Sequence, residues 1–110
     1  MMIRKILLTS LLCLASFNVF AAGDYDAGKI KAYTCTGCHG IVDYKNTYPT
    51  YKVPRIGGQN KEYLVIALQG FKSGEREHKT MNLQAEALTE QDIEDIAVYL
   101  EAQTNNPEAE

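Results

Sequence analysis

The sequence predicts a small all-α domain with three main helices. Three segments carry apolar residues three and four positions apart, the spacing that places them on one face of a helix. Each segment opens with a residue type that favours a helix N-cap, namely Asp24, Asn60 and Thr89. No stretch shows the alternation of apolar and polar residues that is typical of a strand, and no internal repeat or domain linker divides the chain.

The N-terminal residues 1–22 have the composition of a secretory signal peptide. A short basic region at 1–5 precedes an apolar run at 6–20 and the small residues Ala21 and Ala22. The run is short for a membrane span and contains polar residues, so a retained anchor is the less favoured alternative. We expect cleavage after Ala21 or Ala22, export to the periplasm, and no stable membrane insertion of the mature protein.

Cleavage would leave about 88 residues, enough for one small domain over residues 23–103. It would also remove Cys13, so that Cys35 and Cys38 are the cysteines of the mature chain. A chain of this size buries a limited core and benefits from a covalent staple. Residues 104–110 are predicted to form a disordered acidic tail.

The first predicted helix covers residues 24–34. Asp24 is its expected N-cap, and Ala27 and Ile30 lie on its apolar face. Gly28 interrupts that face at a cost of about 1 kcal/mol relative to alanine. A close crossing with another helix would explain the glycine, and ordinary tolerance is the alternative.

The next segment, Cys35-Thr36-Gly37-Cys38-His39, has the pattern of a c-type haem attachment site. The two thiols can form thioethers with the haem vinyl groups, and the adjacent imidazole can bind the iron. A thioredoxin-type redox pair would need a βαβ pattern, which is absent from the sequence. Half of a zinc site would need further ligands, and the remaining candidates, Cys13 and His78, are remote. A structural disulfide would leave His39 unexplained. We therefore expect one covalently attached haem c, with the helices and loops wrapped around it.

Residues 41–58 are rich in proline and glycine and show no sustained period, so we expect a long loop. Long loops in compact domains are usually functional or packed on a ligand. This loop is expected to cover a haem edge, with its tyrosines shielding the ring or bonding the propionates.

The second predicted helix covers residues 60–73. Its N-cap is Asn60, its apolar face contains Leu64, Leu68 and Phe71, and Gly74 ends it. Residues 73–82 are polar and aperiodic, and they are predicted to form a loop.

This polar loop contains the candidates for the sixth iron ligand. With His39 as the fifth ligand, Met81 and His78 are the remaining methionine and histidine after signal removal. A lone methionine usually fills a core, but Met81 lies in a polar segment, so it is the favoured ligand. His78 and an open sixth position remain as alternatives.

The last predicted helix begins at Thr89, which forms a capping-box pattern with Asp92. Ile93, Ile96 and Leu100 follow at helical spacing.

Charge is unevenly distributed along the chain. The full sequence has 11 basic and 14 acidic residues. Residues 27–80 carry nine basic and four acidic side chains, whereas residues 81–110 carry eight acidic ones and no Lys or Arg. A basic haem side could steer the protein toward an acidic patch on a redox partner, although the charges could equally serve only to solvate the surface. The acidic mature chain makes nucleic-acid binding unfavourable.

Together these segments resemble the small bacterial class I cytochromes c, in particular the periplasmic monohaem proteins of the c-553 kind. The resemblance covers essentially the whole mature chain. It is carried by Gly28-Lys29, the segment 35–40, the segments 53–59 and 71–76, Met81, and the segment 87–99.

The resemblance implies specific roles for several residues. The Pro54 carbonyl is expected to accept the His39 ring N–H, Met81 is expected to bind iron on the distal side, and Gly28 is expected to mark a crossing of the first and last helices near residues 96–100. One departure is Asn82, which stands where many relatives have proline.

The expected function is that of a periplasmic one-electron carrier with His/Met-ligated haem c, not an enzyme. Its expected partners are a membrane reductase complex, a terminal oxidase or a periplasmic dehydrogenase, and the protein is expected to be a monomer. The alternative is a haem subunit of a dehydrogenase or oxidase complex, or a small peroxidase-like protein.

Overall fold

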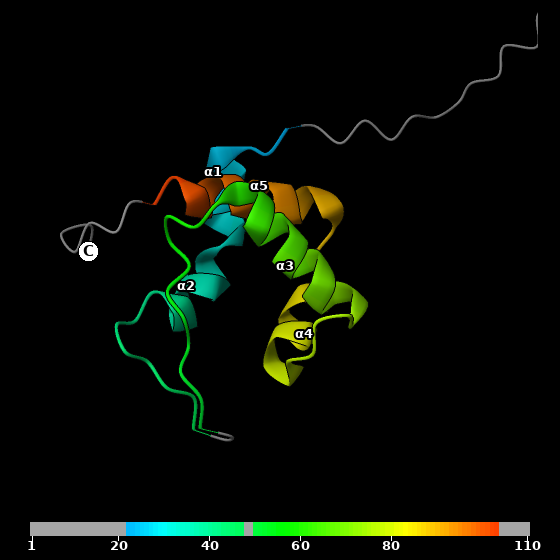
Figure 1. Cartoon of the computed structure of the whole chain (residues 1–110). Helices are drawn as coiled ribbons and strands as arrows, with labels where there is room; N and C mark the ends of the chain where they lie inside the picture. The colour runs from blue at the N-terminus through cyan, green and yellow to red at the C-terminus, as the bar shows by residue number, and fades with distance from the viewer. Residues whose placement is uncertain (1–21, 48–49, 104–110) are drawn as a thin grey trace, which may run out of the picture.

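The computed structural model describes residues 22–47 and 50–103, and the helices within these ranges confirm the all-α prediction. They are α1 (Tyr25–Lys31), α2 (Tyr33–His39), α3 (Lys61–Ser73), α4 (Lys79–Glu86) and α5 (Glu90–Glu101) (Figure 1). In the described part of the chain, β-type pairing is limited to one isolated antiparallel bridge between Lys45 and Lys52. The predicted tail, and all of the predicted signal peptide except Ala22, lie outside the described residues.

The core lies where α1, α3 and α5 meet. Leu64 and Leu68 of α3 pack with Ile93, Ile96 and other buried residues of α5. Ile93 and Ile96 are the largest side chains that are fully buried. The apolar spacing of the second and last predicted helices is therefore confirmed as a core-facing pattern.

The predicted N-caps are also confirmed. Asp24 accepts a hydrogen bond from the Ala27 N–H at 2.7 Å, and Asn60 accepts one from the Tyr63 N–H at 3.0 Å. Thr89 and Asp92 form a complete capping box at the start of α5. At the end of α3, Gly74 has φ of 81°, a conformation that glycine adopts without steric cost.

Gly28 marks a close helix crossing, as expected. A Cβ at this position would collide with the carbonyl oxygen of Asp95 and lie 2.8 Å from Cβ of Tyr99. Tyr99 falls within the expected stretch 96–100, and Asp95 lies one residue before it. The crossing brings α1 and α5 into backbone contact.

A buried ion cluster joins the same two helices. Asp95 is 3 % exposed and accepts hydrogen bonds from Lys31 Nζ at 2.5 Å, the Asp24 N–H at 2.8 Å and Gln91 Nε2 at 2.9 Å. Lys31 also pairs with Asp92 at 2.8 Å. The hydrogen bonds from Lys31 and from the Thr89 N–H lower the pKa of Asp92 to about 2. Burial alone would raise the pKa of Asp95, but its donors outweigh burial and lower it.

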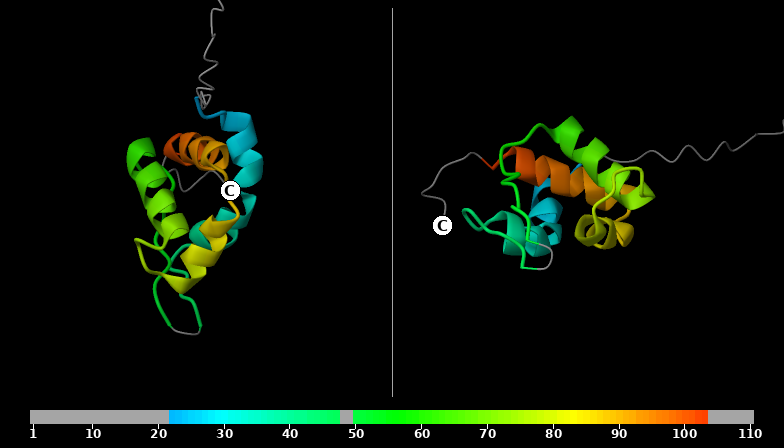
Figure 2. Two further views of the ribbon diagram at one scale, coloured as in Figure 1. Left: turned by 90° about the vertical axis from the view of Figure 1, so that its right-hand side faces the viewer. Right: turned by 60° about the horizontal axis from the view of Figure 1, so that its bottom comes forward.

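The first predicted helix has different bounds in the structure. Helix α1 ends at Lys31, and after Ala32 the chain continues as α2 to His39. The haem-attachment pattern is therefore helical. The two helices follow one another along one edge of the molecule (Figure 2).

The loop prediction for residues 73–82 is wrong at its C-terminal end, because helix α4 begins at Lys79. His78 acts as the N-cap, and its Nδ1 accepts the Met81 N–H at 3.3 Å. Histidine is not among the usual N-cap residues, and Ala85 is the one buried residue of α4. Neither a familiar cap nor an apolar stripe therefore signals this helix, and Met81 lies in its first turn.

Helices α2 and α4 lie at the edge of the core, against which Cys35 and Met81 pack. Among the described helices, α2 contacts only α1, and α4 contacts only α3. In Figure 1 they lie on opposite sides of the lower half of the molecule. No helix in the described ranges combines the length and the apolar character needed to cross a membrane.

Candidate cofactor site

Cys35 and Cys38 lie one turn apart on α2 with free thiols. Residues three apart on a helix share a face, so both thiols can reach one flat ligand. Cys35 is half-buried against the core, and burial raises the pKa of its thiol. Cys38 is exposed.

The alternatives for this cysteine pair find no support in the described residues. The two cysteines are not joined as a disulfide. No three His, Cys, Asp or Glu side chains from residues 22–47 and 50–103 gather as a metal site would require. A thioredoxin-type site would lie beside a sheet, and helices make up the regular structure of these ranges.

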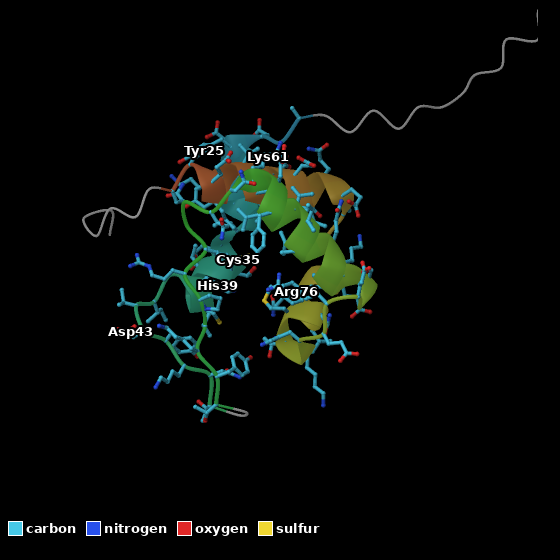
Figure 3. All side chains as sticks on the ribbon, in the orientation of Figure 1. Tyr25, Cys35, His39, Asp43, Lys61 and Arg76 are labelled. Atoms are coloured by element: carbon cyan, nitrogen blue, oxygen red, sulfur yellow. The ribbon has the colours of Figure 1, made fainter. Side chains whose placement is uncertain are left out.

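His39 ends α2, next to the two thiols (Figure 3). Its Nδ1 lies 2.6 Å from the carbonyl oxygen of Pro54. A carbonyl oxygen only accepts hydrogen bonds, so Nδ1 must carry the hydrogen. In the neutral ring Nε2 then has a free lone pair, which is the state that binds a metal. The resemblance implied this contact with Pro54, which follows the buried Val53 in the loop.

His78 has the opposite arrangement. Its Nδ1 accepts the Met81 N–H and therefore carries no hydrogen. The hydrogen of the neutral ring must then lie on Nε2, so that neither nitrogen is free to bind iron without breaking the cap. The ring also packs edge-on against Tyr51, with centroids 4.7 Å apart, and near Phe71.

Met81 lies across from α2, in the first turn of α4. Its side chain is half-buried and packs against the core cluster. Two thiols and a correctly protonated imidazole on α2, with a thioether on a separate helix, form a donor set that fits a haem c.

The loop at 41–58 connects the two sides of this site. The Asn46 N–H donates to the Tyr51 carbonyl at 2.8 Å, and the Val53 N–H donates to the Tyr44 carbonyl at 2.9 Å, which forms a narrow hairpin. From this hairpin the Tyr51 hydroxyl bonds Oγ1 of Thr80 at 2.8 Å. The prediction that the loop tyrosines shield a ring or bond propionates did not include this bridge to α4.

The residues around Met81 include one that sequence reasoning did not assign to the site. Asn82 makes side-chain hydrogen bonds to three backbone groups of residues 71–78. Its position directly after Met81, where many relatives have proline, was the available signal.

The chain is similar in sequence to several known proteins. A family model described as "Cytochrome c" matches residues 25–104. Cytochrome c4 of Stutzerimonas stutzeri is 36 % identical over 91 % of this chain and 51 % of its own length. Cytochrome c-554(548) of Halomonas halodenitrificans is 36 % identical over 74 % of this chain and 99 % of its own length. Cytochrome c-553 of Helicobacter pylori strain J99 is 30 % identical over 87 % of this chain and 95 % of its own length. The chain thus spans about half the length of the cytochromes c4 that it matches.

Proposed function

The chain belongs to the cytochrome c family, and from this premise we propose that it is a periplasmic one-electron carrier whose haem iron is bound by His39 and Met81. Members of this family are electron-transfer proteins with covalently attached haem c, not enzymes. The haem supplies a reversible one-electron change between ferric and ferrous iron.

Cys35 and Cys38 would hold the haem through thioethers. Both thiols are free and lie on one face of α2, directly before His39. Because this spacing is fixed, the two thioethers would set the position of the haem relative to the His39 imidazole.

The observation that most strongly supports the ligand pair is the difference in hydrogen-bond partners between the two histidine rings. The His39 ring donates to Pro54 and keeps Nε2 available, whereas the His78 ring accepts from Met81 and does not. His78 also holds the first turn of α4, so recruiting it as a ligand would cost the helix its cap. Met81 is therefore the better distal ligand.

The charges around the site support a partner with an acidic surface. Lys45 and Lys52 on the hairpin, Arg55 beside Pro54, and Lys79 at the start of α4 are all exposed. The apolar side chains of Val42 and Leu83 are 60 % and 70 % exposed. A basic rim with apolar contacts suits brief docking, with an on-rate that falls as salt rises. A membrane reductase complex, a terminal oxidase or a periplasmic dehydrogenase are the partners we propose.

The periplasmic location rests on the leader-like composition of residues 1–22. Direct N-terminal sequencing of the exported protein tests it. Cleavage after Ala21 or Ala22 is the expected result, and retention of residues 1–21 in the exported protein would contradict it.

Optical and redox titration of the holoprotein tests the ligand pair. The oxidised wild type should show the sulfur-to-iron charge-transfer band, and Met81→Ala should lose it. His78→Asn is the matched control, because asparagine can replace the N-cap but cannot supply an imidazole. Its band should persist.

Two outcomes would contradict this function. Carbon monoxide binding to the reduced wild type at neutral pH would indicate an open sixth position. Stable co-purification with a catalytic subunit would favour the alternative role within an enzyme complex.

A further inference from the structure

Asn82 directly follows Met81 and is half-buried between α4 and the end of α3. Its carboxamide nitrogen donates to the Phe71 carbonyl at 2.7 Å and to the Arg76 carbonyl at 2.9 Å. Its carboxamide oxygen accepts the His78 N–H at 2.8 Å. Both donors and the acceptor of this one side chain are therefore engaged with the backbone.

These three backbone groups lie where helical hydrogen bonding stops. Phe71 belongs to the last turn of α3, and its carbonyl also accepts the N–H of the C-cap residue Gly74 at 3.3 Å. Arg76 and His78 belong to the connection between α3 and α4. Asn82 thus adds a second hydrogen bond at the end of α3 and ties the connection between α3 and α4 to α4.

The same residue also fixes the position of His78 from both sides. The Asn82 backbone N–H donates to the His78 carbonyl at 2.7 Å, while its side chain accepts the His78 N–H. His78 in turn accepts the Met81 N–H through its ring. The backbone of Met81 is held by a residue that Asn82 immobilises.

We propose that Asn82 is a positioning residue that keeps Met81 in place as the distal ligand. The proposal rests on the proposed ligation by Met81. Proline would stiffen this position by restricting φ, whereas the asparagine restrains the whole connection through three hydrogen bonds. Loss of the carboxamide should free the first turn of α4 and raise the fraction of molecules in which Met81 has left the iron.

Displacement of Met81 by added imidazole measures that fraction. The apparent dissociation constant of a competing ligand is inversely proportional to the population of the open form. Asn82→Leu has nearly the same shape and no hydrogen-bonding groups, and it should bind imidazole about tenfold more tightly than the wild type. Gln84→Leu is the matched control, because it removes an exposed amide from the same helix. Its imidazole affinity should not change.

A double-mutant cycle separates positioning of Met81 from general loosening. In a Met81→Ala background no methionine competes with imidazole, so Asn82→Leu should no longer change the affinity. An effect of equal size in that background would overturn the proposal. Unchanged imidazole affinity in the single variant would overturn it as well.

Asn82→Asp provides a second variant in case Asn82→Leu does not yield holoprotein. The aspartate keeps an acceptor for the His78 N–H but places a carboxylate oxygen against the carbonyls of Phe71 and Arg76. Imidazole should again bind more tightly than to the wild type, and Gln84→Glu controls for the added charge. An unchanged affinity in Asn82→Asp would overturn the proposal.

The charge-transfer band distinguishes failure of the proposed Met81 ligation from failure of the proposed positioning role of Asn82. A wild-type protein without the band would overturn both Met81 ligation and its positioning by Asn82. A wild-type band together with unchanged imidazole affinity in the Asn82 variants would overturn only the positioning role.

Discussion

The side of the molecule where α1 crosses α5 is built differently from the side where α2 and α4 carry the site. At the crossing, two backbones touch at Gly28, and Asp95 is buried with three donors. On the site side, α2 contacts only α1 among the described helices, and α4 contacts only α3. The first region is stabilised by its own packing, whereas the second depends on hydrogen bonds from loops and on the covalently attached haem. Because the α1–α5 crossing holds the fold together, the side that carries α2 and α4 can accommodate a large ligand.

The largest expected effect is at the crossing. Gly28→Val would force α1 away from the Asp95 carbonyl, and we expect it to lower the free energy of unfolding by about 3 kcal/mol. Urea unfolding of the holoprotein measures this loss.

Gly37→Ala on α2 is the matched control, because no atom lies within 4 Å of a Cβ built there. It should leave stability unchanged or raise it by up to about 1 kcal/mol. Similar losses of unfolding free energy in Gly28→Val and Gly37→Ala would show that the α1–α5 crossing and the site side do not differ in packing.

An intermediate effect is expected in acid, again at the crossing. The pKa of Asp92 is lowered from its usual value to about 2, so its ionised form stabilises the folded protein above the unfolded-state pKa. That contribution is lost as pH falls from about 4 toward 2, and we expect it to be about 1–2 kcal/mol after allowing for partial exposure.

Urea unfolding at a series of pH values tests this slope. Asp92→Asn should reduce this slope, since the variant has no proton to gain at this position, and the slope that remains includes Asp95, whose pKa is also lowered. A wild-type slope that survives in Asp92→Asn would place the acid sensitivity elsewhere.

The smallest expected effect sharpens the comparison on the site side. Tyr51→Phe removes the hydroxyl that bonds Thr80 and should change the free energy of unfolding by less than about 0.5 kcal/mol. It should nevertheless tighten imidazole binding about threefold, because the hairpin no longer holds the first turn of α4.

Tyr44→Phe is the control for the loss of a loop tyrosine hydroxyl, and its imidazole affinity should match that of the wild type. A large stability loss in Tyr51→Phe, with unchanged imidazole affinity, would show that the hairpin belongs to the scaffold.

The sequence predicted the features that depend on local pattern. The apolar spacing of α3 and α5, the caps at Asp24, Asn60 and Thr89, and the stop at Gly74 all agree with the structure. Helix α4 was missed because its cap is a histidine and it buries little apolar surface. A helix that is held by its neighbours leaves a weak signal in its own residues.

The residues of the candidate site also divide into those that a local pattern predicts and those that it does not. Cys35, Cys38 and His39 are contiguous, so their spacing alone is informative. Pro54 was reached through resemblance to a family, whereas Met81 was already favoured over His78 as the remaining methionine in a polar segment, and the resemblance implied the same role. The contacts of Asn82 were not predictable from the chain, because its partners are backbone groups, which have no residue identity to recognise.

The isolation of α2 also bears on how the protein matures. Cys38 is exposed, and the helix that carries both thiols touches only α1 among the described helices. An attachment enzyme can therefore reach Cys38 on the folded chain, whereas Cys35 is less accessible because it is half-buried against the core.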